Sequence, residues 1–147
     1  MSEPQALLII AASEIDSNLY YATRFLAPDP FVFLQVDGRK LLLMSDLEID
    51  RARAQALVDE VLSLSLYERK AHQRWQFPHL TDTISLLLEA CDVRSVTVPS
   101  VFPLEYADRL RERGIRVMPK ADPFFPERLI KSEAEITAIA EAQRHTE

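Results

Sequence analysis

The stretch SVTVPSVFPLEYADRLRERGIRVM, residues 95–118, has two short apolar segments separated by a helical pattern. Residues 95–98 and 115–118 predict strands, and Pro103 opens a helix where its missing N–H is harmless. Three apolar residues lie on the inner face of that helix: Leu104, Ala107 and Leu110. Gly114 follows where a left-handed residue commonly ends a helix. A strand, a helix and a second strand form a βαβ unit, so we expect parallel strands, a right-handed crossover and an α/β fold.

The segment before this unit predicts a second amphipathic helix. Five residues fall on one stripe of a helix: Leu80, Ile84, Leu87, Leu88 and Cys91. Because burial raises the pKa of a thiol and suppresses its reactivity, we expect Cys91 to be an inert core residue.

The amino-terminal half predicts three strands. The continuous apolar run 6–12 has the length of a buried strand. The apolar runs 31–36 and 40–44 flank Asp37-Gly38, a dipeptide that favours a tight hairpin turn.

Helical signals lie between and after these strands. Residues 16–18 offer capping oxygens for a short helix that Pro28 stops, and residues 47–57 predict a surface helix. Residues 58–66 predict a strand that ends in a short helix at Tyr67. Together with the βαβ unit, these patterns predict about six strands and several helices in an α/β fold.

Composition restricts the class of protein. The 147 residues include 17 Lys and Arg against 23 Asp and Glu, so the formal net charge is −6. This acidic balance argues against a nucleic-acid partner, and no apolar run approaches the roughly 20 residues of a membrane span. Only two glycines are present, which excludes phosphate-binding loops built on several glycines. The single cysteine and the lack of a basic leader segment indicate a cytoplasmic protein.

The sequence shows no catalytic or metal-binding pattern. His72, His79 and His145 are not spaced one helical turn apart, so surface or helix-capping roles are favoured. Asp46, Glu48 and Asp50 are interleaved with or followed by arginines, which favours a charged helix face over a cation site. We therefore expect no catalytic, cofactor-binding or metal-ligating residue in this chain.

Aromatic side chains beside a guanidinium are typical of protein interfaces, although the same residues suit a core. The candidate interface residues are Tyr20, Tyr21, Arg24, Phe25, Phe124 and Phe125. Both interpretations stay open for the aromatics. Trp75 and Phe77 follow the basic stretch 69–74, and we expect them to pack at the periphery.

Three segments resemble the amino-terminal domain of the creatinase, prolidase and Xaa-Pro aminopeptidase family, the pita-bread metallopeptidases. They are NLYYATRF at 18–25, SDLEIDRAR at 45–53 and ERLIKSEAEI at 127–136. The resemblance implies a ribonuclease H-like fold, in which a mixed sheet is flanked by helices. It also implies a non-catalytic domain that shapes substrate access and subunit contacts. One departure is Arg24, because many relatives have glycine after the Tyr-x-Thr of this segment.

The family resemblance also implies the division of the parent protein. Residues 1–131 would form the amino-terminal domain, and residues 132–147 the start of a linker helix to a missing catalytic domain. Ser132 and Glu135 support that helix, because they form a capping box. The parent implied is an Xaa-Pro aminopeptidase that holds two divalent metal ions, of the Mn or Co type, in its catalytic domain.

The resemblance further implies two partners, namely the parent's own catalytic domain and a second subunit in a homodimer. No membrane or nucleic-acid partner is expected. The alternative from another class is a free-standing α/β module that binds a ligand or a protein and has no peptidase activity.

Overall fold

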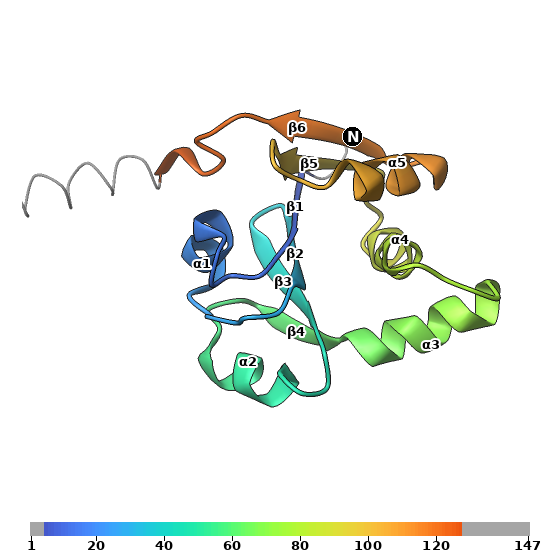
Figure 1. The fold of residues 1–147 in the computed structure, drawn as a ribbon, viewed down its shortest axis with the longest axis horizontal. Helices are drawn as coiled ribbons and strands as arrows, with labels where there is room; N and C mark the ends of the chain where they lie inside the picture. Colours follow the sequence, from blue (N-terminus) through green and yellow to red (C-terminus); the bar gives the residue numbers. More distant parts are fainter. Residues whose placement is uncertain (1–4, 128–147) are drawn as a thin grey trace, which may run out of the picture.

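The computed structural model describes residues 5–127 (Figure 1). Along this part of the chain the elements are β1 (Ala6–Ala11), α1 (Ser17–Thr23), β2 (Phe31–Val36), β3 (Arg39–Met44), α2 (Ile49–Gln55), β4 (Glu60–Ser63), α3 (Leu64–Arg74), α4 (Leu80–Ala90), β5 (Ser95–Pro99), α5 (Leu104–Glu112) and β6 (Arg116–Lys120). The expected linker helix from Ser132 onward and the boundary at residue 131 lie outside the described residues.

The strands form one mixed sheet in the order β4-β3-β2-β1-β5-β6. Strand β2 runs antiparallel to both of its neighbours, and the other adjacent pairs are parallel. The sheet separates α1 and α2 from α4 and α5 (Figure 1). The predicted α/β class, the mixed sheet and the parallel pairing of β5 with β6 are therefore confirmed.

Each face of the sheet has its own core because successive side chains of a strand point to opposite faces. In β1, Leu8 and Ile10 pack with α4 and α5, whereas Ile9 packs with α1 and α2. The buried aromatics gather on the second side: Phe25, Phe31, Phe33, Phe124 and Phe125.

Two turns have the backbone that the sequence predicts. Asp37 and Gly38 have φ values of 50° and 86°, as a two-residue hairpin turn between β2 and β3 requires. Gly114 has a φ of 84° and follows the end of α5, where an L side chain would be strained.

Helix α3 is longer than the sequence analysis predicted. We expected only a short helix at Tyr67, but the helix runs from Leu64 to Arg74. The Ser63 side chain caps its start by accepting a hydrogen bond from the backbone N–H of Leu66 at 3.2 Å. Buried Ala71 and partly buried Tyr67 lie one turn apart, so the core packing of the following turn extends the helix.

The prediction for Cys91 is only partly right. Helix α4 ends at Ala90, so Cys91 is its C-cap residue and is half-buried rather than a full member of the core. Burial raises the pKa of the Cys91 thiol, and the nearby Glu60 carboxylate raises it further. A raised pKa disfavours the reactive thiolate, in the direction that the sequence analysis expected.

Candidate functional site

The carboxyl ends of the parallel strands meet at one edge of the sheet. We call this region the carboxyl edge and define it by the loops 12–16, 26–30, 45–48 and 100–103, which follow β1, precede β2, follow β3 and follow β5. In α/β sheets, binding sites are commonly formed by the loops at this edge.

Strands β1 and β5 form a topological switch point. They are parallel neighbours, but α1 after β1 and α5 after β5 cover opposite faces of the sheet. A hollow of about 270 Å³ lies between the two loops and is lined by Ile15, Val101 and Phe102, among others. This is the position where the crevice of a doubly wound sheet takes its ligand.

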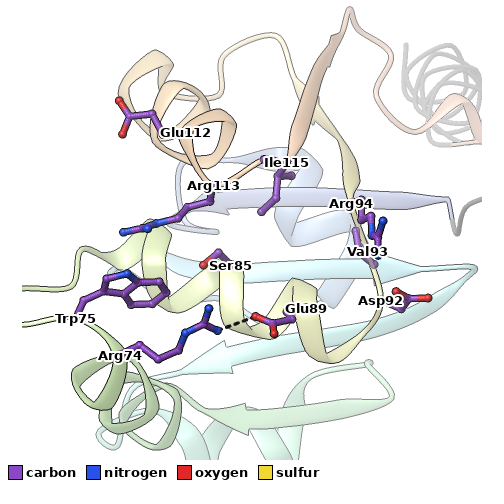
Figure 2. A pocket seen from close by; sticks show the side chains of 11 residues that line it. Arg74, Trp75, Ser85, Glu89, Asp92, Val93, Arg94, Glu112, Arg113 and Ile115 are labelled. Atoms are coloured by element: carbon purple, nitrogen blue, oxygen red, sulfur yellow. Dashed lines mark hydrogen bonds and ion pairs between the residues drawn. The ribbon is translucent and has the colours of Figure 1, made fainter.

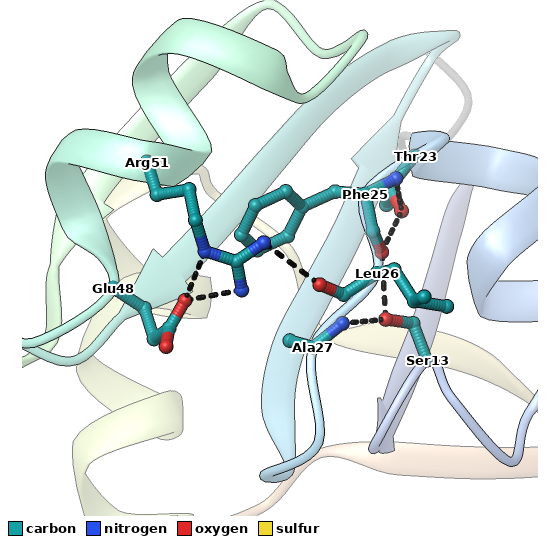
Figure 3. A network of polar contacts seen from close by, with 7 residues as sticks. All are labelled: Ser13, Thr23, Phe25, Leu26, Ala27, Glu48 and Arg51. Carbon is teal, nitrogen blue, oxygen red and sulfur yellow. Dashed lines mark hydrogen bonds and ion pairs between the residues drawn. The ribbon is translucent and has the colours of Figure 1, made fainter.

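Ser13 fixes two of these loops to each other (Figure 3). Its hydroxyl donates to the carbonyl oxygen of Phe25 at 2.6 Å and accepts from the backbone N–H of Ala27 at 2.7 Å. The backbone N–H of Glu14 also donates to the carbonyl oxygen of Ala27, at 3.2 Å. Because Ser13 is buried, these bonds replace hydrogen bonds to water and hold the loop backbone in one conformation.

Arg51 joins the first two sequence segments that carry the family resemblance (Figure 3). Arg51 belongs to the segment 45–53 and Phe25 to the segment 18–25. The guanidinium carbon of Arg51 lies 4.3 Å from the centroid of the Phe25 ring. The guanidinium also donates to the Leu26 carbonyl oxygen at 3.0 Å and forms an ion pair with Glu48. These segments therefore have a structural role, because they fix the loop that leads into β2.

A second and larger hollow lies away from the carboxyl edge, among α3, α4 and α5. It measures about 620 Å³ and is lined by residues at the ends of α3, α4 and α5. Figure 2 shows Trp75 between Arg113 and Arg74, whose guanidinium carbons are 4.3 and 4.9 Å from the indole centroid. Arg74 pairs with Glu89 at 2.8 Å, and Arg113 pairs with Asp82 at 2.8 Å. The cluster ties three helices together, so Trp75 packs at the periphery as predicted. The same prediction is wrong for Phe77, which is 86% exposed.

Asp82 has a lowered pKa within this cluster. Its burial alone would raise the pKa, but the hydrogen bonds from the His79 backbone N–H and from Arg113 outweigh that effect. A lowered pKa in the folded state stabilises the protein above the unfolded pKa of about 3.9, and this stabilisation is lost as the pH falls through the folded value.

We therefore expect Asp82→Asn to lower the free energy of unfolding by about 1–2 kcal/mol at pH 7. The difference between the variant and the unchanged protein should shrink as the pH falls below about 3.9. Urea unfolding at several pH values measures both quantities. Asp108→Asn, which removes the exposed partner of Arg111, is the control and should cost less than about 0.5 kcal/mol. A gap that widens in acid would contradict the assignment.

The structure divides the candidate interface residues into two groups. Phe25, Phe124 and Phe125 are buried in the core, which supports the second of the two interpretations left open for them. Tyr20 and Arg24 are exposed and Tyr21 is half-buried, so these three remain available to a partner, and their contact with one stays a prediction.

Arg24 occupies a position that favours glycine. It is the C-cap residue of α1 and has a left-handed φ of 53°. Its guanidinium carbon lies 5.8 Å from the Tyr20 ring centroid and 5.3 Å from that of Tyr21. These cation–π contacts offset part of the cost of the left-handed backbone. The departure from the family pattern is thus accommodated locally.

The histidines and the acidic residues that the sequence analysis considered as site candidates do not form a metal site within residues 5–127. His79 directly precedes α4, and its backbone N–H donates to the Asp82 carboxylate at 2.8 Å. His72 is exposed on α3, and His145 lies outside the described residues. Asp46 accepts a hydrogen bond from Ser65 at 3.0 Å. Within residues 5–127, no group of three or more His, Cys, Asp or Glu side chains is arranged to hold a metal ion.

The sequence analysis missed the exposed aliphatic residues of the carboxyl edge. Ile15 and Leu47 each stand between two acidic residues, in Glu14-Ile15-Asp16 and Asp46-Leu47-Glu48. An aliphatic residue in such a triplet, within the loop that follows a strand, is the signal that could have identified them. In the part of the chain that the structure describes, no helix is long and apolar enough to cross a membrane.

Comparison with known proteins reveals similarity at the level of structure. No protein-family model matches the chain, and no curated protein sequence matches it. The solved structure of an aminopeptidase P, an Xaa-Pro aminopeptidase from Streptococcus thermophilus, matches with a TM-score of 0.57 and 15% identity, over 80% of this chain and 79% of that one. An X-Pro aminopeptidase from Thermotoga maritima matches with a TM-score of 0.60 and 12% identity, over 80% of this chain and 31% of that one.

A prolidase from Pyrococcus furiosus shows the same relationship. Its TM-score is 0.54 at 11% identity, and the match covers 80% of this chain and 28% of the prolidase chain. At such identities the likeness is one of fold. The chain therefore has a fold that also occurs within Xaa-Pro aminopeptidases and prolidases, as the sequence resemblance implied.

Proposed function

We propose that this chain is the non-catalytic amino-terminal domain of an Xaa-Pro aminopeptidase, in which it shapes substrate access and subunit contacts. The observation that carries the proposal is the fold likeness, which covers 80% of the chain in both Xaa-Pro aminopeptidases and a prolidase. In two of these proteins the matched part is less than a third of the solved chain. A parent with a further catalytic domain fits that relationship.

The side chains of the described residues support a non-catalytic role. The carboxylates of Glu48, Asp82 and Glu89 are each paired with an arginine that holds neighbouring elements together. The Cys91 thiol has a raised pKa, because burial and the Glu60 carboxylate outweigh the opposing effect of Arg39, and a raised pKa disfavours the thiolate that a nucleophile needs. These groups contribute to the stability of the domain.

The two divalent metal ions that the family resemblance implies do not fit the described part of this chain. Residues 5–127 offer no group of three suitable side chains, and metal-assisted peptide hydrolysis requires such a ligand set. We assign the metals to the catalytic domain of the parent. The partners in this proposal are that domain and a second subunit of a cytoplasmic homodimer.

We expect the 147-residue chain to be catalytically silent. Incubation with Xaa-Pro dipeptides and longer Xaa-Pro peptides, with Mn²⁺ or Co²⁺ added, should release no amino acid above a buffer control, because residues 5–127 offer no ligand set for a dinuclear site. The Thermotoga maritima enzyme serves as the positive control. Turnover that a chelator abolishes would contradict the proposal.

The size of the native protein separates this proposal from the free-standing module. An antibody raised against the chain should detect a polypeptide well above 16.8 kDa in the source cells, and its immunoprecipitate should cleave Xaa-Pro peptides in a chelator-sensitive manner. Detection of a 16.8 kDa species alone, without such activity, would favour the free-standing binding module.

A further inference from the structure

Four strongly exposed aliphatic residues lie along the carboxyl edge. The exposed fractions are 93% for Leu47, 52% for Leu26, 88% for Ile15 and 78% for Val101. One residue comes from each of the four loops that define this edge. Burying such side chains against a partner would remove apolar surface from water, which stabilises a complex.

Direct contacts between the loops make these residues neighbours. Arg51 pairs with Glu48, next to Leu47, and donates to the carbonyl oxygen of Leu26. The loop of Leu26 is bonded through Ser13 and Glu14 to the loop of Ile15. Ile15 and Val101 line the same hollow at the switch point. The four residues therefore stand on adjoining loops of one edge. Three of these loops are held together by hydrogen bonds before any partner binds, which lowers the entropic cost of binding.

The charge of this surface has a single sign. Its loops contain five carboxylates, namely Glu14, Asp16, Asp29, Asp46 and Glu48, and they contain no lysine or arginine. Arg51 of α2 offsets one of these charges through its pair with Glu48. A partner that approaches this edge therefore meets an acidic field and is favoured if it is basic.

A narrow pocket at the same edge, which we call the edge pocket, combines apolar walls with carboxylates. The edge pocket has a volume of about 100 Å³ and mostly apolar walls, with Phe31, Leu43 and Leu80 among them. The carboxylate residues Asp29 and Glu48 also line it. The side chain of a lysine or arginine matches this arrangement, because its methylenes can lie against apolar walls while its charge stays near carboxylates.

The acidic charge of the carboxyl edge disfavours two other occupants, a second copy of this chain and an anionic lipid surface. A second copy of this chain would bring the same acidic edge against this one, and like charges oppose each other there. An anionic lipid surface is repelled in the same way. A basic protein surface is the occupant that both the aliphatic residues and the carboxylates favour.

We propose that the carboxyl edge docks another protein domain through a surface that carries aliphatic side chains together with lysine or arginine. One basic side chain of that surface enters the edge pocket, and the aliphatic residues pack on Ile15, Leu26, Leu47 and Val101. This inference rests on the proposed function only in that both place a second protein domain beside this chain. It does not require that domain to be a peptidase.

The test is an NMR titration of the full 147-residue chain with an amphipathic peptide of leucine and lysine about 15 residues long. We expect the largest shifts at the four aliphatic residues and at Asp29. The affinity should fall several-fold in about 0.5 M salt. The double variant Ile15→Ser with Val101→Ser should weaken binding roughly fivefold or more, and Asp29→Asn roughly threefold.

Matched variants outside the carboxyl edge serve as controls. Leu57→Ser changes an aliphatic residue that is 67% exposed between α2 and β4, and Asp92→Asn removes an exposed carboxylate before β5. Each should change the affinity by less than about twofold. Amide spectra of every variant confirm that it is folded.

Three outcomes would overturn the inference. The first is equal binding of a peptide in which glutamate replaces lysine. The second is an equal loss of affinity in the control variants, or shifts that centre away from this edge. The third is a dimer of the chain, seen by analytical ultracentrifugation, that Ile15→Ser dissociates, because a second copy would then be the occupant. None of these outcomes bears on whether the parent cleaves Xaa-Pro peptides.

Discussion

Ser13→Ala should lower the free energy of unfolding by about 1–3 kcal/mol, because it leaves the buried Ala27 N–H without a partner. It also leaves the Phe25 carbonyl oxygen only the longer hydrogen bond from the Thr23 hydroxyl, at 3.5 Å. The Ser13 hydroxyl contacts the Phe25 carbonyl oxygen and the Ala27 N–H at 2.6 and 2.7 Å. Each unsatisfied buried group costs roughly 1–3 kcal/mol. Chemical denaturation monitored by circular dichroism measures the change.

Ser17→Ala is the matched control for this substitution. Ser17 is exposed at the first position of α1, where alanine is an adequate helix former. Its replacement should change the free energy of unfolding by less than about 0.5 kcal/mol. Equal effects of the two serine variants would show that the loop contacts in Figure 3 contribute little to stability.

Phe33→Ala should destabilise the domain by about 3–5 kcal/mol, because it opens a cavity in the centre of the sheet. Phe33 is fully buried on β2, where it stands opposite Ile9 of β1 and Leu42 of β3. These neighbours belong to central strands that cannot collapse freely into the space, so much of the cavity should persist. Equilibrium unfolding in urea gives the value.

Phe77→Ala makes the same chemical change at a site that is 86% exposed, in the segment between α3 and α4. We expect it to alter the free energy of unfolding by less than about 0.5 kcal/mol. If the two phenylalanine variants unfolded at the same urea concentration, the placement of Phe33 in the core would be wrong.

Local chemistry made much of the fold predictable. Asp37-Gly38 predicted the hairpin because few dipeptides adopt two successive positive φ values at low cost, and both residues have them. Leu87 and Leu88 lie on a helical stripe that the fold buries on the sheet. Such signals depend on neighbours in sequence, and they survive in the folded chain because the tertiary packing agrees with them.

Where packing decided, the sequence was a weaker guide. Helix α3 was underestimated because its residues 64–74 have few apolar side chains, and its length depends on contacts with α4. Cys91 fits the stripe of α4 by spacing, but the helix ends at Ala90, one residue before Cys91. The backbone then turns away from the helix, because Asp92 has a left-handed φ of 56°. The last turn of a helix is sensitive to such local changes.

At the candidate site, too, the sequence shows the local segments and only the tertiary structure shows which of them meet. The segments 18–25 and 45–53 could be read from the sequence, but not the contact of Arg51 with Phe25 that joins them. The acidic–aliphatic triplets at Ile15 and Leu47 are visible in the sequence as well. That both stand at one edge, in line with Val101, depends on the strand order.

The sequence by itself determined the α/β class, the hairpin and the parallel βαβ unit, because these follow from periodicity and turn chemistry within short stretches. Only the tertiary structure decided which aromatics are buried and which loops meet. Phe25 and Phe124 are far apart along the chain and lie in one core, since the order of strands brings α1 and the segment after β6 onto the same face of the sheet. The carboxyl edge is likewise a product of strand direction, because parallel strands carry the residues that follow them to a common edge.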